Sequence, residues 1–312
     1  VAATINRNGG GRDQGAFFVE GEGVRWCVVC LGMPASTSGL LVTGTSQATV
    51  LALASARQKA LGVETRGQGI FESPRLTAYA VEGVHNATIK ALELLGIGSK
   101  ALKLIPARGD GSGLDVEILA ARVAEDRKAG LLPFCVVGTA GSVDLGRFDP
   151  LDRLADFCAR ENLWFHVDGA FGAWARIAEA PWCDLVRGID RADSIALDFH
   201  KWMYVQYDCG LVLIRDEQDQ RAAFASRPAY LVTQEAGLGG GEPWYCDYGT
   251  DLSRGFRALK VWSSLRTYGR AAFSAAITQN CRLAAEMGRL VEASSELELM
   301  APVVSNVCCF SL

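Results

Sequence analysis

Residues 164–170 read WFHVDGA, an apolar β-type run that ends in the carboxylate of Asp168. A strand without polar alternation is typical of a parallel sheet that is covered on both faces. Because a buried carboxylate without a partner is costly, Asp168 should meet a cation or a hydrogen-bond donor where the strand ends. This stretch therefore predicts both the fold class and the edge of the sheet at which function lies.

On both sides of this stretch, apolar β-type runs alternate with helical patterns from about residue 39 onward. The alternation predicts an α/β fold with a mainly parallel sheet sandwiched by helices, whose functional residues gather at the carboxyl ends of the strands. Ser46 is the expected cap of the first helix and Gly62 its stop. The expected strands are 76–81, 101–107, 134–137, 163–167, 194–197 and 210–214, and the expected helices are 46–61, 86–95, 115–129 and 149–161.

Length and composition predict one large domain and part of a smaller one. The chain has 312 residues, of which 49% are hydrophobic, enough to bury a large core. We expect residues 1–270 to form the large domain and residues 271–312 to begin a small, incomplete C-terminal domain, after a helix over 253–268. The glycine-rich stretch 234–243 is expected to be a mobile loop over the site.

Charge and cysteine content argue against several classes of protein. A net charge of -4, with scattered basic residues, gives no footprint for nucleic acid or an anionic membrane. No apolar run approaches the roughly 18 residues of a membrane span, and the start does not resemble a signal peptide, so we expect a cytoplasmic protein. The ten cysteines are irregularly spaced and expected to be reduced. Cys27 and Cys30 are expected at apolar positions of a short helix, because nothing completes a redox or zinc site there, and no metal is predicted.

Other polar stretches also follow the expected strands. TGTS at 43–46 offers backbone N–H groups, hydroxyls and a positive helix end, which suit a phosphate, although a simple helix cap is the alternative. Lys201 could be a desolvated Schiff-base nucleophile or a surface lysine over Trp202. Asp168 could hold a protonated pyridine nitrogen, or merely cap a loop or pair with an arginine. All three histidines, His85, His166 and His200, fall at strand ends, which favours a single site.

Together these motifs resemble the group II pyridoxal 5'-phosphate (PLP) dependent decarboxylases, which include aromatic-L-amino-acid, tyrosine, histidine and glutamate decarboxylases. The resemblance rests on HVDGAFG (166–172), ADS (192–194), HKW (200–202) and DCG (208–210), and it extends from about Gly9 to the end, including SRGFRALK (253–260). It implies the PLP-dependent transferase fold type I, which is aspartate aminotransferase-like. It also implies a homodimer that acts on an L-amino acid with PLP.

The resemblance implies a role for each site residue. Lys201 would hold PLP as a Schiff base, and Asp168 would pair with the pyridine nitrogen. Ala170 would pack beneath the ring, and His85 would stack above it. Thr45 and Ser46 would bind the phosphate, and Ser142 would keep a hydroxyl near the cofactor. His200 would lie beside the cofactor, near the phosphate and the substrate, and Asp198 also stands at a cofactor-binding position.

The family's mobile loop carries a tyrosine that returns a proton to the substrate after carbon dioxide leaves. Counting back from Lys260 without gaps gives Tyr245, with Tyr248 as a close second.

Three features depart from the family pattern. GSV at 141–143 replaces the frequent Gly-Thr-Thr, so only Ser142 keeps a hydroxyl. Asp198 stands where many members have a phosphate-binding asparagine, and a carboxylate there would repel phosphate unless it were protonated or turned away. The family's N-terminal segment is missing and the C-terminal domain is short, so the chain resembles a truncated product.

The predicted function is therefore PLP-dependent decarboxylation of an L-amino acid, by resemblance an aromatic one, to its amine and carbon dioxide. Retention of His85 and of a tyrosine near position 245 favours this reaction over that of the family's aldehyde synthases, which decarboxylate and then oxidise. A non-catalytic homologue and a metal hydrolase using His166, Asp168 and His200 are the remaining alternatives.

Overall fold

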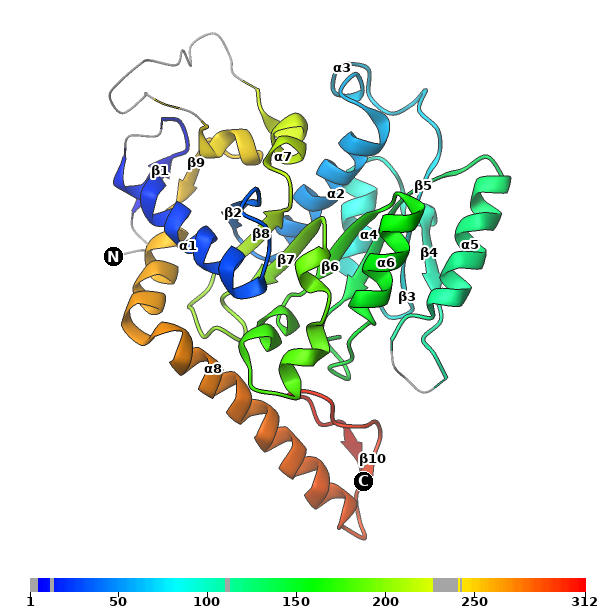
Figure 1. The fold of residues 1–312 in the computed structure, drawn as a ribbon, viewed down its shortest axis with the longest axis vertical. Helices are drawn as coiled ribbons and strands as arrows, with labels where there is room; N and C mark the ends of the chain where they lie inside the picture. The colour runs from blue at the N-terminus through cyan, green and yellow to red at the C-terminus, as the bar shows by residue number, and fades with distance from the viewer. Residues whose placement is uncertain (1–4, 12–13, 110–112, 227–240, 242) are drawn as a thin grey trace.

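The structure, a computed structural model, describes residues 5–11, 14–109, 113–226, 241 and 243–312. Its centre is a seven-stranded sheet in the order β2-β8-β7-β6-β5-β3-β4 (Figure 1). Within this sheet β8 runs against β2 and β7, whereas β3, β4, β5, β6 and β7 pair in parallel, so the predicted α/β fold is confirmed. The strands are β2 (Ser38–Val42), β3 (Leu76–Val81), β4 (Leu102–Ile105), β5 (Leu132–Thr139), β6 (Trp164–Asp168), β7 (Ser194–Asp198) and β8 (Gly210–Ile214).

Helices connect the strands, and local chemistry explains where several of them begin and end. The Asp115 carboxylate accepts hydrogen bonds from the backbone N–H groups of Glu117 and Ile118 and so caps the helix that follows. Gly32 adopts a left-handed φ of 75° that ends the first helix. The longer helices are α1 (Gly15–Leu31), α2 (Thr45–Leu61), α4 (Asn86–Leu94), α5 (Val116–Lys128), α6 (Leu151–Glu161), α7 (Glu217–Phe224) and α8 (Arg257–Glu292). The short ones are α3 (Thr65–Gln68), η1 (Ser99–Ala101), η2 (Gly172–Ile177), η3 (Trp182–Val186), η4 (Ile189–Arg191) and η5 (Tyr245–Tyr248).

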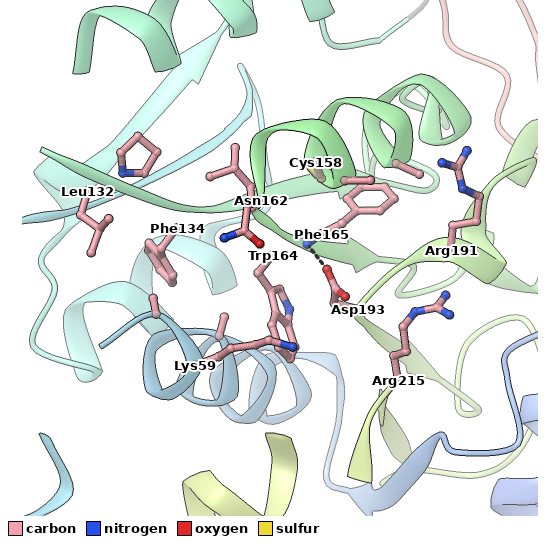
Figure 2. Close-up of a pocket in the computed structure, with 16 residues that line it drawn as sticks. Lys59, Leu132, Phe134, Cys158, Asn162, Trp164, Phe165, Arg191, Asp193 and Arg215 are labelled. Carbon is pink, nitrogen blue, oxygen red and sulfur yellow. Dashed lines mark hydrogen bonds between the residues drawn. The ribbon is translucent and has the colours of Figure 1, made fainter. Parts of the chain in front are cut away.

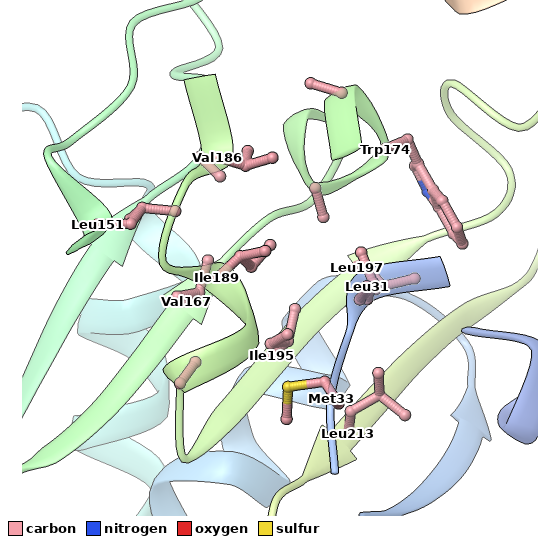
Figure 3. Close-up of a cluster of buried hydrophobic side chains, with 14 of the residues drawn as sticks. Leu31, Met33, Leu151, Val167, Trp174, Val186, Ile189, Ile195, Leu197 and Leu213 are labelled. Atoms are coloured by element: carbon pink, nitrogen blue, oxygen red, sulfur yellow. The ribbon is translucent and has the colours of Figure 1, made fainter. Parts of the chain in front are cut away.

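The sheet separates two hydrophobic cores. Side chains of α2 and α4 form one core on one face, and side chains of α1, α5 and α6 belong to the other. Along β6, Trp164 faces the first core while Phe165 and Val167 face the second, as the period of two in a strand requires. Figure 3 shows part of the second core, to which Leu31 at the end of α1 and Leu197 of β7 both belong. Burial on both faces explains why the strands are continuous apolar runs.

The C-terminal part differs from the predicted helix over 253–268. Ser253–Gly255 forms strand β9, which pairs with β1 (Asn6–Asn8), so the helix starts only at Arg257. Helix α8 then continues to Glu292, across the predicted boundary after residue 270, with a kink at Gly269 (φ 69°, ψ 169°). After it, β10 (Glu298–Leu299) pairs with β11 (Phe310–Ser311). The division into two domains stays a prediction. Most of the predicted glycine-rich loop 234–243 lies outside the described residues.

No disulfide bond joins the cysteines of the described residues, and Cys27 and Cys30 are buried within α1. This helix is longer than the short one expected, with 17 residues. Among the described helices none is both long and apolar enough to cross a membrane.

A buried charge network ties the N-terminal segment to the sheet. The Glu20 carboxylate, 2% exposed on α1, accepts hydrogen bonds from Arg7 at 2.8 Å and from Arg254 at 3.0 Å. It also accepts the backbone N–H of Leu41 in β2 at 3.0 Å. Such a network is stable only while each charge keeps its partners, because an uncompensated buried charge is costly.

Replacing Glu20 by alanine should therefore lower the free energy of unfolding by about 3–5 kcal/mol, because two buried arginines lose their counter-charge. Glu22, on the same helix with a 49% exposed side chain, is the matched control, and Glu22→Ala should cost less than about 1 kcal/mol. Urea unfolding followed by circular dichroism measures both values. Equal losses for the two variants would show that the network is not a stabilising element.

Candidate active site

The carboxyl ends of β2, β3, β5, β6 and β7 lie at one edge of the sheet, and a cavity of about 700 Å³ opens there. Its walls come from segments far apart in the sequence, and they include nine of the ten residues predicted for the site. The lining residues are Gly44, Thr45, Ser46, Gly83, His85, Thr139, Gly141, Ser142, Val143, Asp168, Ala170, Phe171, Asp198, His200, Lys201, Trp202, Tyr204, Tyr207, Asn280, Asn306 and Val307.

Asp168 is a nearly unpartnered carboxylate at the end of β6. It is 5% exposed, and it accepts the backbone N–H of Ala170 at 3.2 Å. Burial raises the pKa of Asp168, while this hydrogen bond and the charges of His85 and Lys201 act in the opposite direction. The carboxylate is thus placed to gain from a further cation or proton donor.

Lys201 and Asp198 form an ion pair at the end of β7. The Lys201 Nζ lies 3.0 Å from Asp198 Oδ2, and His200 Nε2 lies 3.5 Å from the same oxygen. The Lys201 side chain is 40% exposed, whereas that of Asp198 is 2% exposed. The amine is therefore held at the cavity by a fixed carboxylate.

The start of α2 is capped differently from the prediction. Gly44, not Ser46, is the N-cap, and it has no side chain to accept a hydrogen bond. The Asp198 carboxylate instead accepts the backbone N–H of Thr45 at 2.7 Å. Thr45 Oγ1 is buried and has no hydrogen-bond partner within the described part of the chain. The prediction of a Ser46 cap is therefore wrong, because a carboxylate from a distant strand takes that role.

The histidines have distinct surroundings. His85 is the N-cap of α4, where its Nδ1 accepts the backbone N–H of Ala87 at 3.2 Å. His200 Nδ1 accepts the backbone N–H of Cys209 at 2.9 Å, and its ring stacks on Tyr207 at 4.2 Å between centroids. Burial lowers the pKa of His200, partly offset by Asp198. Both rings reach the cavity, whereas His166 does not line it.

Tyr245 and Tyr248, the two candidates for the loop acid, do not line the cavity. Tyr245 is 5% exposed in η5, its ring packed against Phe17 at 4.8 Å between centroids and lying 4.7 Å from the guanidinium carbon of Arg7. Tyr248 donates a hydrogen bond to Glu217 at 2.8 Å. In this structure both tyrosines belong to a packed turn away from the cavity, and the role of Tyr245 as the loop acid stays a prediction.

The cavity also contains residues that the sequence did not single out. Thr139 ends β5, and its Oγ1 is buried without a partner among the described residues. Asn280 Oδ1 accepts hydrogen bonds from Trp202 Nε1 at 2.8 Å and Tyr204 Oη at 2.6 Å, which fixes its amide. Asn306 Oδ1 is likewise buried with no described partner. For Thr139 the signal was available, since it ends an apolar strand.

A second cavity of about 670 Å³ lies at the opposite edge of the sheet, near the starts of β5 and β6 (Figure 2). Its charged side chains are already bound within the protein. Asp193 accepts the backbone N–H of Phe165 at 2.8 Å, and Arg191 pairs with Asp156 at 2.7 Å. Lys59 pairs with Asp219 at 2.6 Å. Because these charged side chains already have partners, the second cavity offers a ligand few free polar groups to bind. The first cavity is therefore the better candidate for the active site.

Metal chemistry finds no support in the described residues, where no group of three or more His, Cys, Asp or Glu could hold a metal ion. Of the three residues considered for a metal hydrolase, His166 is fully buried, with its Nδ1 2.8 Å from Ser194 Oγ.

With this geometry in place, comparison with known proteins identifies the family. The model of the pyridoxal-dependent decarboxylase conserved domain matches residues 20–312. The chain belongs to the pyridoxal-dependent decarboxylase family. The predicted family is thus confirmed, and PLP is the cofactor of its members.

Individual pyridoxal-dependent decarboxylase relatives give the same result. The aromatic-L-amino-acid decarboxylase of Bacillus atrophaeus is 35% identical over 95% of this chain and 59% of its own length. The 4-hydroxyphenylacetaldehyde synthase of Rhodiola rosea is 31% identical over 95% and 60%. The crystal structure of Oryza sativa TDC with PLP and tryptamine has a TM-score of 0.86 at 29% identity, covering 95% of this chain and 61% of that one. Fold type I is confirmed, and the chain spans about three fifths of the length of these relatives.

The fully buried His166 should make stability depend on pH. Burial lowers the pKa of His166 to about 3. Below about pH 6.5 the unfolded chain binds a proton that the folded chain does not, so this residue should lower the free energy of unfolding by about 1.4 kcal/mol per pH unit as the pH falls from about 6 to 4. Urea unfolding at pH 7, 6 and 5 should show a shallower pH dependence for His166→Gln than for wild type. Identical slopes would mean that His166 is protonated in the folded protein.

Proposed function

We propose that this chain is the PLP-binding part of an enzyme that decarboxylates an L-amino acid to its amine and carbon dioxide. The observation that carries the proposal is the meeting of three groups at one cavity. These are the amine of Lys201, the carboxylate of Asp168 and the start of α2, where Thr45 Oγ1 has no hydrogen-bond partner among the described residues. Lysine, carboxylate and phosphate-binding turn are the groups that a PLP site requires.

The residues present fit PLP. Thr45 and Ser46 lie at the start of α2, whose N–H groups and positive dipole end favour a phosphate. Asp168 is a buried carboxylate whose pKa is raised by burial, and a protonated pyridine nitrogen beside it would offset that cost. His85 and Ala170 line the same cavity, and we assign them to the two faces of the ring. Ser142 and His200 complete the proposed contacts.

Each side chain then has a defined task. When bound, PLP supplies an electron sink for the bond that joins the substrate's Cα to its carboxylate. Lys201 would hold the cofactor through Nζ. Asp168 would keep a proton on the pyridine nitrogen, which makes the ring a better electron sink. His85, at the exposed start of α4, orients the ring.

We further propose an aromatic side chain for the substrate. Phe171, Trp202, Tyr204 and Tyr207 line the cavity and give it an aromatic wall. Several relatives carry names of enzymes for aromatic amino acids. The buried Asn306 Oδ1 is an acceptor without a partner among the described residues, so a substrate that carries a hydroxyl or N–H would bind it.

Aldehyde synthesis is the second candidate, and one observation favours it. In this conformation no tyrosine from η5 can deliver a proton to the cavity, and proton return separates simple decarboxylation from oxidation. Relatives include 4-hydroxyphenylacetaldehyde synthase and phenylacetaldehyde synthase. Retention of His85 supports decarboxylation. Measuring amine, peroxide and ammonia together distinguishes the two reactions.

A homodimer remains part of the proposal. The face of α8 beyond its kink exposes Leu283, Met287 and Leu290, at 58%, 44% and 55%. Contiguous apolar side chains of this kind are typical of surfaces that another chain covers. Light scattering of the purified protein measures the assembly directly.

Lys201→Ala should abolish covalent attachment of PLP and lower decarboxylation by at least about a thousandfold, because no other group of the site can take its place. Borohydride reduction followed by peptide mass spectrometry locates the attachment in the wild type. Lys59→Ala, in the second cavity, is the control and should keep attachment unchanged. Attachment to Lys201→Ala at the wild-type level would refute the assignment, and wild-type protein that never binds PLP would indicate a non-catalytic homologue.

Asn306→Ala should lower kcat/KM for L-tyrosine by about tenfold, the value of one hydrogen bond to a buried group. For L-phenylalanine, which offers no donor on its ring, the change should stay within about twofold. Carbon dioxide release from the two substrates measures both. Equal losses for both substrates would argue that Asn306 shapes the cavity without contacting the side chain.

A further inference from the structure

Asp198 takes a place at which an anion is expected. It is 2% exposed at the end of β7, and its Oδ1 accepts the backbone N–H of Thr45, the first residue of α2, at 2.7 Å. Its other oxygen, Oδ2, lies 3.0 Å from Lys201 Nζ. One carboxylate thus serves both the helix start and the site lysine.

The surrounding backbone leaves this carboxylate little freedom. Asp198 N–H donates to Ala170 O at 3.0 Å, and Trp174 Nε1 donates to Asp198 O at 2.9 Å. A Cβ on Gly210 would lie 2.5 Å from the Gly44 Cα and 2.8 Å from Asp198 Oδ1. Glycine at position 210 is therefore required for the close approach of β8, the turn before α2 and the carboxylate.

The same helix start also shows a sign of a missing ligand. Thr45 Oγ1 is buried, with its residue 7% exposed, and it has no hydrogen-bond partner among the described residues. A phosphate there would satisfy this hydroxyl and use the positive end of the helix dipole. The phosphate would also lie beside the Asp198 carboxylate, which already accepts the backbone N–H of Thr45 in the same turn.

Like charges within a buried turn oppose each other. The groups that face Asp198 are Lys201, His200 and, more distantly, Asp168. Lys201 offsets the Asp198 charge only while its Nζ is protonated. His200 is shifted toward its neutral form by burial.

We propose that Asp198 is a resident anion at the start of α2 that opposes the phosphate of PLP, so that this protein holds its cofactor loosely. The inference rests on the proposed function, because it takes PLP as the cofactor. Asp198 is a positioning residue for Thr45 and Lys201, and it acts on phosphate affinity through charge.

The test compares PLP with pyridoxal, which has the same aldehyde and ring but no phosphate. Asp198→Asn keeps the shape of the side chain and removes its charge. It should bind PLP at least about tenfold more tightly than wild type, whereas its affinity for pyridoxal should stay within about twofold. Absorbance titration of the lysine adduct measures both dissociation constants. Asp198→Ser, smaller and also neutral, should give the same pattern if the asparagine variant does not fold.

Asp168→Asn is the matched control, since it removes a buried carboxylate from the same cavity but not from the helix start. Asp168→Asn should weaken the binding of PLP and of pyridoxal by the same factor. If Asp198→Asn also changes the dissociation constants of PLP and pyridoxal by the same factor, Asp198 acts on Lys201 and not on the phosphate. The inference is then overturned.

A separate measurement distinguishes failure of this inference from failure of the proposed function. If wild-type protein forms no adduct with either aldehyde, the proposed function fails. Inorganic phosphate then decides the inference alone. Phosphate should raise the melting temperature of Asp198→Asn at a concentration at least about tenfold lower than the one needed for wild type. If both proteins need the same phosphate concentration, the inference is overturned.

Discussion

Burial of the sheet on both faces is the constraint on which the site depends. Strands β5, β6 and β7 are almost entirely buried, so polar side chains that serve a ligand can lie only where the strands end. Thr139 and Asp168 are register partners in neighbouring strands, and Asp198 ends the next strand. Because neighbouring strands lie about 4.8 Å apart, these three side chains form one wall of the cavity.

Two carboxylates of this wall meet the cost of burial in different ways. Asp198 accepts a hydrogen bond from a backbone N–H and lies beside Lys201 Nζ, which offsets its charge while Nζ is protonated. The Asp168 carboxylate accepts one backbone N–H at 3.2 Å, and burial raises its pKa. Part of the free-energy cost of burying its charge is therefore left for a ligand to offset. In the proposed function, the two residues would therefore face opposite ends of the bound cofactor: a cationic end at Asp168, and an anionic end that would share the start of α2 with Asp198.

Features that depend on local pattern could be predicted from the sequence, and features that depend on distant contacts could not. The limits of β3 and β8 agree with the predicted ranges, because turn residues bound the apolar runs there. The predicted cap of α2 was wrong because the group that accepts the Thr45 N–H, the Asp198 carboxylate, lies 153 residues away in the sequence. Asn280 and Asn306 enter the cavity from the C-terminal segment, and no local pattern marks an asparagine as a pocket residue. Tyr245 was placed by counting, which takes no account of the buried space between Phe17 and Arg7.

The position of Tyr245 bears on the chemistry as well as on prediction. Its ring lies beside Arg7 and Arg254, the two cations that pair with Glu20. Moving the phenol to the cavity would remove two cation–π contacts, worth about 1–2 kcal/mol each, and would open apolar surface against Phe17. A rearrangement that costs several kcal/mol is populated in well under one molecule in a hundred. In the proposed reaction, proton return by Tyr245 would therefore be slow unless substrate binding itself favours the rearranged state, and slow proton return would favour the second candidate reaction, aldehyde synthesis.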